Sequence, residues 1–108
     1  MVTAQGHPRA IFQRAIERGN LAVAETVLRT EIARPTLVDL LELTALIAQS
    51  DPGRRGRVTT RWLQRYLEAS VDRTIDEVAF AVAALQALGT ANHVRALDAL
   101  REIARRVA

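Results

Sequence analysis

The chain has 108 residues, a formal net charge of +3 and no cysteine. This length suits one domain with a single core, and the lack of cysteine excludes disulfides, thiolate metal sites and cysteine nucleophiles. Hydrophobic residues make up 49% of the chain and charged residues 25%, which is typical of a globular protein rather than a disordered one. Only 4% of the residues are aromatic, so the core must be built from Ala, Leu, Val and Ile.

The N-terminal third predicts a tail followed by two helices. Residues 1–7 have neither the basic start nor the apolar segment of a signal peptide, so we expect a flexible tail and a cytoplasmic protein. Pro8 is suited to the first helical position and Gly19 to a C-terminal stop, which predicts a helix over residues 8–18. Asn20 is a good N-cap for a second helix, whose apolar residues recur at helical spacing as far as residue 32.

The middle of the chain predicts a helix pair around a polar break. Thr36 and Asp39 have the spacing of a capping box, which starts a third helix ending near Ser50. This helix is apolar on most of its circumference and therefore belongs in the middle of the domain. The next helix is expected over residues 58–70, and residues 51–57 between them are expected to form an arginine-rich loop.

Two further helices are expected at the C-terminal end. Thr74 and Glu77 also have capping-box spacing and start a fifth helix that ends at Gly89. Since this helix leaves little polar surface, we expect it to be as buried as the third. A sixth helix is expected over residues 91–106. Its apolar side offers a candidate homodimer surface, formed by Val94, Leu97, Leu100, Ile103 and Val107.

Together these elements predict an all-α fold of about six helices, arranged as three antiparallel hairpins in a short α-solenoid or a compact bundle. The start signal at Thr36 recurs 38 residues later at Thr74, which is consistent with a repeat. Residues 15–24 resemble the turn region of tetratricopeptide-type hairpins, and the repeat spacing is similar to that of HEAT repeats. Both resemblances concern architecture and assign no binding residue.

The positive charge is concentrated around the polar break. Residues 54–73 hold six arginines against two acids, Glu68 and Asp72. Arg57, Arg61 and Arg65 recur every four residues and would line one helix face. Threonine hydroxyls and free N–H groups in a first helical turn can bind an anion. We therefore take the following as candidate binding residues for a partner or a phosphate group: Arg54, Arg55, Arg57, Thr59, Thr60, Arg61 and Arg65.

Three interpretations of this arginine patch remain open. It could contact an acidic protein surface or a nucleic-acid backbone. It could also be an ordinary solvated helix face, because every basic residue of the chain is arginine, as the codon usage of a GC-rich bacterial genome would give. Trp62 and Tyr66 lie beside the patch in sequence, and we expect both in the core.

The sequence offers no basis for catalysis. His7 falls in the expected tail, and His93, which we expect to be partly exposed at a helix start, has no nucleophile or acid at a telling spacing. Neither a metal-ligand motif nor a glycine-rich phosphate loop with its lysine is present, so we expect no cofactor and no metal. The apolar run over residues 78–88 is too short to span a bilayer. We therefore expect a non-enzymatic module that binds a protein partner through the 51–65 region, with nucleic-acid binding through the same arginines as the alternative.

Overall fold

The computed structural model describes residues 7–107. It contains six α-helices and one short 3-10 helix within that range, in the order α2 (Pro8–Arg18), α3 (Leu21–Thr30), α4 (Leu37–Ser50), η1 (Pro52–Arg54), α5 (Arg55–Ala69), α6 (Ile75–Ala87) and α7 (His93–Val107). These described residues are 80% helical and contain no strand, so the predicted all-α class is confirmed. Of the expected tail, only His7 falls inside the described range.

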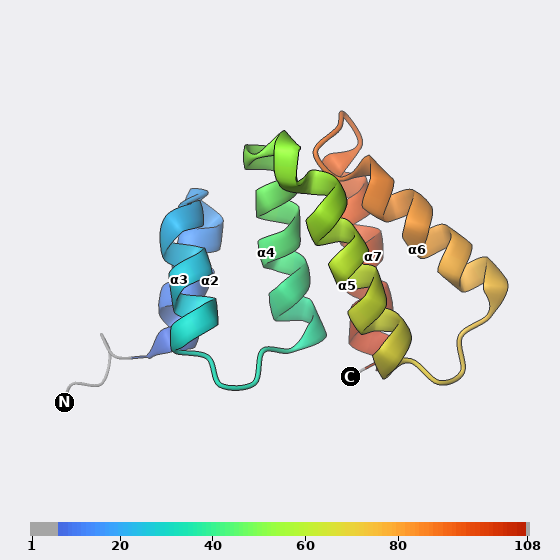
Figure 1. Ribbon diagram of the computed structural model, residues 1–108, viewed down its shortest axis with the longest axis horizontal. Helices are drawn as coiled ribbons and strands as arrows, with labels where there is room; N and C mark the ends of the chain where they lie inside the picture. The colour runs from blue at the N-terminus through green and yellow to red at the C-terminus, as the bar shows by residue number, and fades with distance from the viewer. Residues whose placement is uncertain (1–6, 108) are drawn as a thin grey trace.

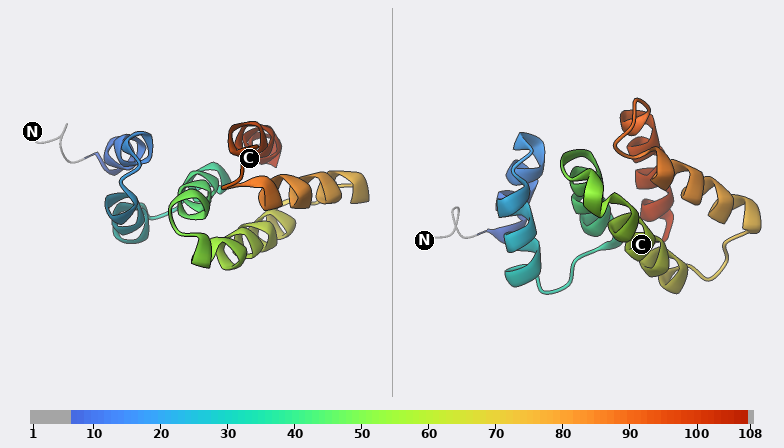
Figure 2. Two further views of the ribbon diagram at one scale, coloured as in Figure 1. Left: turned by 90° about the horizontal axis from the view of Figure 1, so that it is seen from above. Right: turned by 45° about the horizontal axis from the view of Figure 1, so that its top comes forward.

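The helices pair in sequence as three hairpins, α2 with α3, α4 with α5 and α6 with α7. The hairpins stand in a row, with α2 and α3 at one end and α6 at the other (Figures 1 and 2). The row measures 48 × 29 × 20 Å. Helix α4 occupies the middle and contacts α2, α3, α5 and α7.

The expected N-caps form at the helix starts. At α4 the full capping box is present: the Asp39 backbone N–H donates to Thr36 Oγ1 at 3.1 Å, and the Thr36 N–H donates to Asp39 Oδ2 at 2.9 Å. At α6 only half of the box forms, because Thr74 Oγ1 accepts from the Glu77 N–H at 3.1 Å while the Glu77 carboxylate accepts a hydrogen bond from the Tyr66 hydroxyl at 2.9 Å. A residue expected to cap its own helix therefore joins α6 to α5 instead.

Two apolar clusters hold the described residues together. The larger one lies among α4, α5, α6 and α7 and includes Trp62 and Tyr66, which are 1% and 0% exposed, as expected. The smaller one lies within the α2–α3 hairpin and reaches α4 through Leu46. The N-terminal hairpin thus has a core of its own and attaches to α4 along a narrow seam.

Three expectations about exposure are wrong. Helix α6 is not central: it lies at the end of the row, where Ile75 and Phe80 are 87% and 55% exposed. The apolar side of α7 is not free for a homodimer, because Leu100 and Ile103 on that side are buried within the chain's own core. His93 is not partly exposed but buried, and its Nδ1 accepts a hydrogen bond from the Gly89 N–H at 2.8 Å.

Candidate functional site

Of the expected arginine-rich loop over residues 51–57, residues 52–57 are helical in the structure. Pro52, whose ring fixes φ near the helical value, begins the turn of η1, and α5 follows directly from Arg55. Because α5 begins at Arg55, Thr59 and Thr60 lie in its second turn and not in the first turn, where they were expected. The Thr59 hydroxyl donates back to the carbonyls of Arg55 and Gly56 at 2.8 and 3.1 Å, so it is engaged within α5. The anion site expected at Thr59 and Thr60 stays a prediction.

Arg54 is committed to an ion pair with Glu25 of α3. Its Nη2 lies 2.5 Å from Oε2 and its Nη1 3.2 Å from Oε1 of that carboxylate, a bidentate geometry that is stronger than a single contact. The hydrogen bond from Arg54 holds the pKa of Glu25 below its ordinary value, and the same bond raises the pKa of Arg54. Arg29 approaches the same carboxylate at 3.5 Å.

Arg55 holds the ends of two helices. Its Nε donates to the carbonyl oxygen of Ala48 at 3.1 Å, and its Nη2 donates to that of Gly89 at 3.4 Å. The guanidinium thus satisfies a carbonyl near the end of α4, where intrahelical partners run out, and another in the α6–α7 turn. Arg55 therefore has a structural role, and its expected role in binding a partner stays a prediction.

The remaining three arginines of the patch stay available. Arg57, Arg61 and Arg65 are exposed along α5. Within residues 7–107, none of the three makes an ion pair or a side-chain hydrogen bond. The structure thus separates the predicted patch into two fixed arginines, Arg54 and Arg55, and three free ones.

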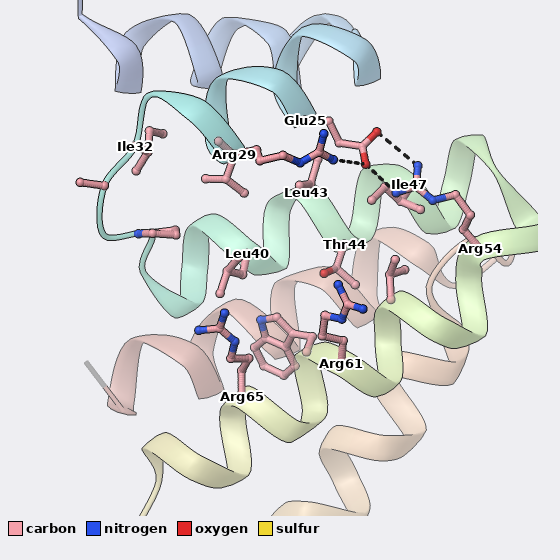
Figure 3. A pocket seen from close by; sticks show the side chains of 15 residues that line it. Glu25, Arg29, Ile32, Leu40, Leu43, Thr44, Ile47, Arg54, Arg61 and Arg65 are labelled. Atoms are coloured by element: carbon pink, nitrogen blue, oxygen red, sulfur yellow. Dashed lines mark hydrogen bonds and ion pairs between the residues drawn. The ribbon is translucent and has the colours of Figure 1, made fainter.

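Two of the free arginines border a groove between α3 and α5 that has α4 as its floor. The groove encloses about 410 Å³. Figure 3 shows Arg61 and Arg65 reaching into it from α5, while Glu25 lies between Arg29 and Arg54 on the opposite side. Its apolar lining comes from all three helices and from the connection before α4: Leu28, Ile32, Ala33, Pro35, Leu40, Leu43, Ile47, Val58 and Trp62.

The α5 side of this α3–α5 groove is held in place by the packing of Trp62. Trp62 stacks on Tyr66 with ring centroids 5.7 Å apart and planes at 6°, and the Trp62 Nε1–H donates to the Leu37 carbonyl at 3.0 Å. A buried indole with its one donor satisfied has little freedom to rotate. The groove therefore has a preformed apolar surface.

Four arginines and one glutamate line the groove, which gives it an excess of positive charge. A second hollow, of about 540 Å³, lies on the other side of α4 between α2 and α7. Its charges are largely neutralised, because Arg101 pairs with Glu42 at 2.6 and 2.9 Å and with Asp98 at 2.9 Å. Of the two, the α3–α5 groove is therefore the better candidate for binding a charged partner.

Sequence reasoning missed the α3 wall of this groove. Glu25 and Arg29 are four residues apart and form an ion pair within α3. This spacing is visible in the sequence and predicts such a pair. That this pair meets Arg54, 29 residues from Glu25, depends on the tertiary packing of the N-terminal hairpin and has no local signature.

No protein-family model, no curated protein and no solved structure matches this chain. Among residues 7–107 no three His, Asp or Glu side chains gather where they could hold a metal ion. None of the helices described is long and apolar enough to cross a membrane. A functional proposal for this chain therefore rests on the geometry of the α3–α5 groove.

Proposed function

We propose that this protein is a non-enzymatic interaction module of the cytoplasm that docks a segment of a partner protein in the α3–α5 groove. The observation that carries the proposal is the combination of an apolar floor with unpaired arginines at its edge. Leu43 and Val58 offer partly exposed apolar surface, while Arg61 and Arg65 offer charge without a partner among the described residues. This combination fits a segment with apolar residues on one side and acids on the other.

The size of the groove suits a short helix. From Arg54 to Arg65 the chain advances eleven residues, which corresponds to about 17 Å along a helix axis, or about three turns. A helical segment of that length presents apolar residues three and four apart to the floor and places acids on the side facing α5. Arginine suits such contacts because its planar guanidinium binds a carboxylate through two parallel hydrogen bonds.

Nucleic-acid binding through the same arginines is the alternative function, supported by the exposed row of Arg57, Arg61 and Arg65 on α5. Two observations favour a protein segment over it. Arg54 and Arg55 are engaged within the chain, which leaves three patch arginines for phosphate contacts. A phosphate backbone also gains nothing from the apolar floor, whereas an amphipathic segment would cover it.

Salt dependence separates the two functions. The probes are a synthetic acidic amphipathic peptide, with Leu and Glu at helical spacing, and a short DNA duplex of random sequence. A fluorescent label on each probe reports binding through its anisotropy, because Trp62, the one tryptophan of the chain, is buried. We expect the peptide to bind with weak salt dependence, because burial of apolar surface contributes to its affinity. Tighter binding of the duplex, with a log–log salt slope near about −2.7 for three phosphates, would contradict the protein-docking function and support the alternative.

A further inference from the structure

Helix α6 lies at the end of the row (Figure 1), and one of its faces is apolar and exposed. Ala81, Ala84 and Leu85 are buried in the core, whereas Ile75, on the far side of the helix, is 87% exposed and Phe80, on its flank, is 55% exposed. Exposed alanines complete this outer face between them, at positions 79 and 83. From residue 78 to residue 88 the helix and its cap have no charged side chain.

The other end of the row is different. On α2 the outward residues are polar, with Arg14, Glu17 and Arg18 exposed. End elements of helical-hairpin rows normally carry such a polar outer face, because they meet water, and a helix that is apolar all round is normally covered. The outer face of α6 therefore resembles a surface that is normally buried, and we expect a partner to cover it.

A second copy of this chain is the occupant that the face fits best. Its two polar positions lie toward opposite ends: Asp76 near the start of α6 and Gln86 near its end. In an antiparallel pair each Asp76 end lies against the Gln86 end of the partner helix, where an amide can donate to a carboxylate. A parallel pair would instead bring two Asp76 carboxylates together. Ala79 and Ala83 stand at the centre, where their small side chains allow close approach of the two helices.

We propose that two copies associate through α6, antiparallel about a two-fold axis that passes near Ala79 and Ala83. The contact is isologous, since the same face is used on both copies. It is independent of the α3–α5 groove, which stays open on both copies. The thirteen residues of α6 give a seam about 20 Å long, and one helix pair of that length buries on the order of 1,000 Å² in total, the lower limit for specific interfaces. The dimer is therefore weak and reversible.

Analytical ultracentrifugation of the full chain across a range of concentrations tests the proposal. The wild type is expected to shift from monomer to dimer within the micromolar range. Ala83→Glu places two carboxylates at the centre of the seam and should abolish the dimer, raising the dissociation constant by at least about tenfold. Ala22→Glu is the matched control, because Ala22 is an exposed alanine of α3, away from α6, and this variant should dimerise as the wild type does. Circular dichroism confirms that both variants are folded.

A second pair of variants tests the antiparallel orientation. Gln86→Arg should tighten the dimer, because the new guanidinium faces Asp76 of the partner copy, and Gln86→Glu should weaken it. A wild type that stays monomeric at sub-millimolar concentration would overturn the proposal and assign the α6 face to a different chain. A dimer that tolerates Ala83→Glu, or that responds equally to both charges at position 86, would also overturn it.

Discussion

Arg54 and Glu25 form a bidentate ion pair, with Nη2 2.5 Å from Oε2 and Nη1 3.2 Å from Oε1. The two residues are 29 positions apart and belong to different hairpins. Their side chains are 30% and 20% exposed, so the pair is shielded from water more than a typical surface ion pair. It connects α3 to η1, and both residues line the α3–α5 groove.

Breaking this ion pair should destabilise the protein. Glu25→Gln or Arg54→Gln alone should lower the free energy of unfolding by about 1–2 kcal/mol, because each leaves a half-buried charge without its partner. The double variant should lose less than the sum of the two single losses, since no charge is then left unpaired. Urea unfolding at neutral pH gives all three values. Additive losses would show that the two side chains do not interact.

Glu25 should also make stability depend on acid pH. Its pKa in the folded protein lies below its ordinary value of 4.5, mainly because Arg54 donates to it. The unfolded chain therefore takes up the proton first, and the stabilisation is complete above about pH 5 and lost as the pH falls through the folded pKa. Urea midpoints of the wild type should fall on acidification below about pH 5, and those of Glu25→Gln should fall less steeply. Parallel pH profiles would argue against this role for Glu25.

His93 should act in a higher pH range. Burial lowers its pKa below 6.5 in the folded protein, with Arg101 and Arg55 adding to the effect, and its Nδ1 must stay unprotonated to accept from the Gly89 N–H. The unfolded chain thus binds a proton near about pH 6.5 that the folded chain does not, so stability falls as the pH drops through this range. The free energy of unfolding of the wild type should decrease between about pH 7.5 and about pH 5.5. That of His93→Gln should not. A wild-type stability that does not change over this pH range would contradict the role of His93.

Gly89 should be the most sensitive glycine among residues 7–107. Its φ is 81°, and an added Cβ would lie 2.6 Å from the Ala48 carbonyl oxygen and 2.6 Å from Arg55 Nη2. Gly19 also has a positive φ, 69°, but a Cβ there would meet nothing within 4 Å. Gly19→Ala should therefore cost about 1 kcal/mol for the backbone conformation alone, and Gly89→Ala about 2–4 kcal/mol, since steric overlap is added. Thermal unfolding compares the two variants, and equal losses would show that the α6–α7 turn relaxes away from Ala48.

Much of the fold could be predicted from local signals. The helix boundaries at Thr36 and Gly19 could be predicted, because N-caps and C-terminal glycines act within a few residues of the chain. The start of α5 could not be predicted in this way. Arg55 has no side-chain cap before it, and the helix there gains stability from contacts with Ala48 and Gly89, which are tertiary.

The candidate site was less accessible to sequence reasoning than the fold. The spacing of Arg57, Arg61 and Arg65 predicted a shared helix face, and the structure places all three along α5 as exposed residues. Spacing could not reveal that Arg54 and Arg55 are used internally, because their partners come from other hairpins. The burial of α6 was also mispredicted. A helix that is apolar on most of its circumference is expected to be buried, but the sequence does not show whether residues of the same chain or of another chain bury it.

The availability of Arg61 and Arg65 at the edge of an apolar groove is the central claim, and the double variant Arg61→Glu/Arg65→Glu tests it most directly. The matched control is Arg14→Glu/Arg18→Glu, which makes the same charge change on exposed residues of α2. Titration of the labelled acidic amphipathic peptide with each protein, followed by fluorescence anisotropy, should show binding to the wild type and the control. The groove variant should bind at least about tenfold more weakly, because two attractive contacts become repulsive, with its urea midpoint unchanged. Equal loss of binding in both variants would contradict the claim, because the peptide would then be responding to net charge and not to the groove.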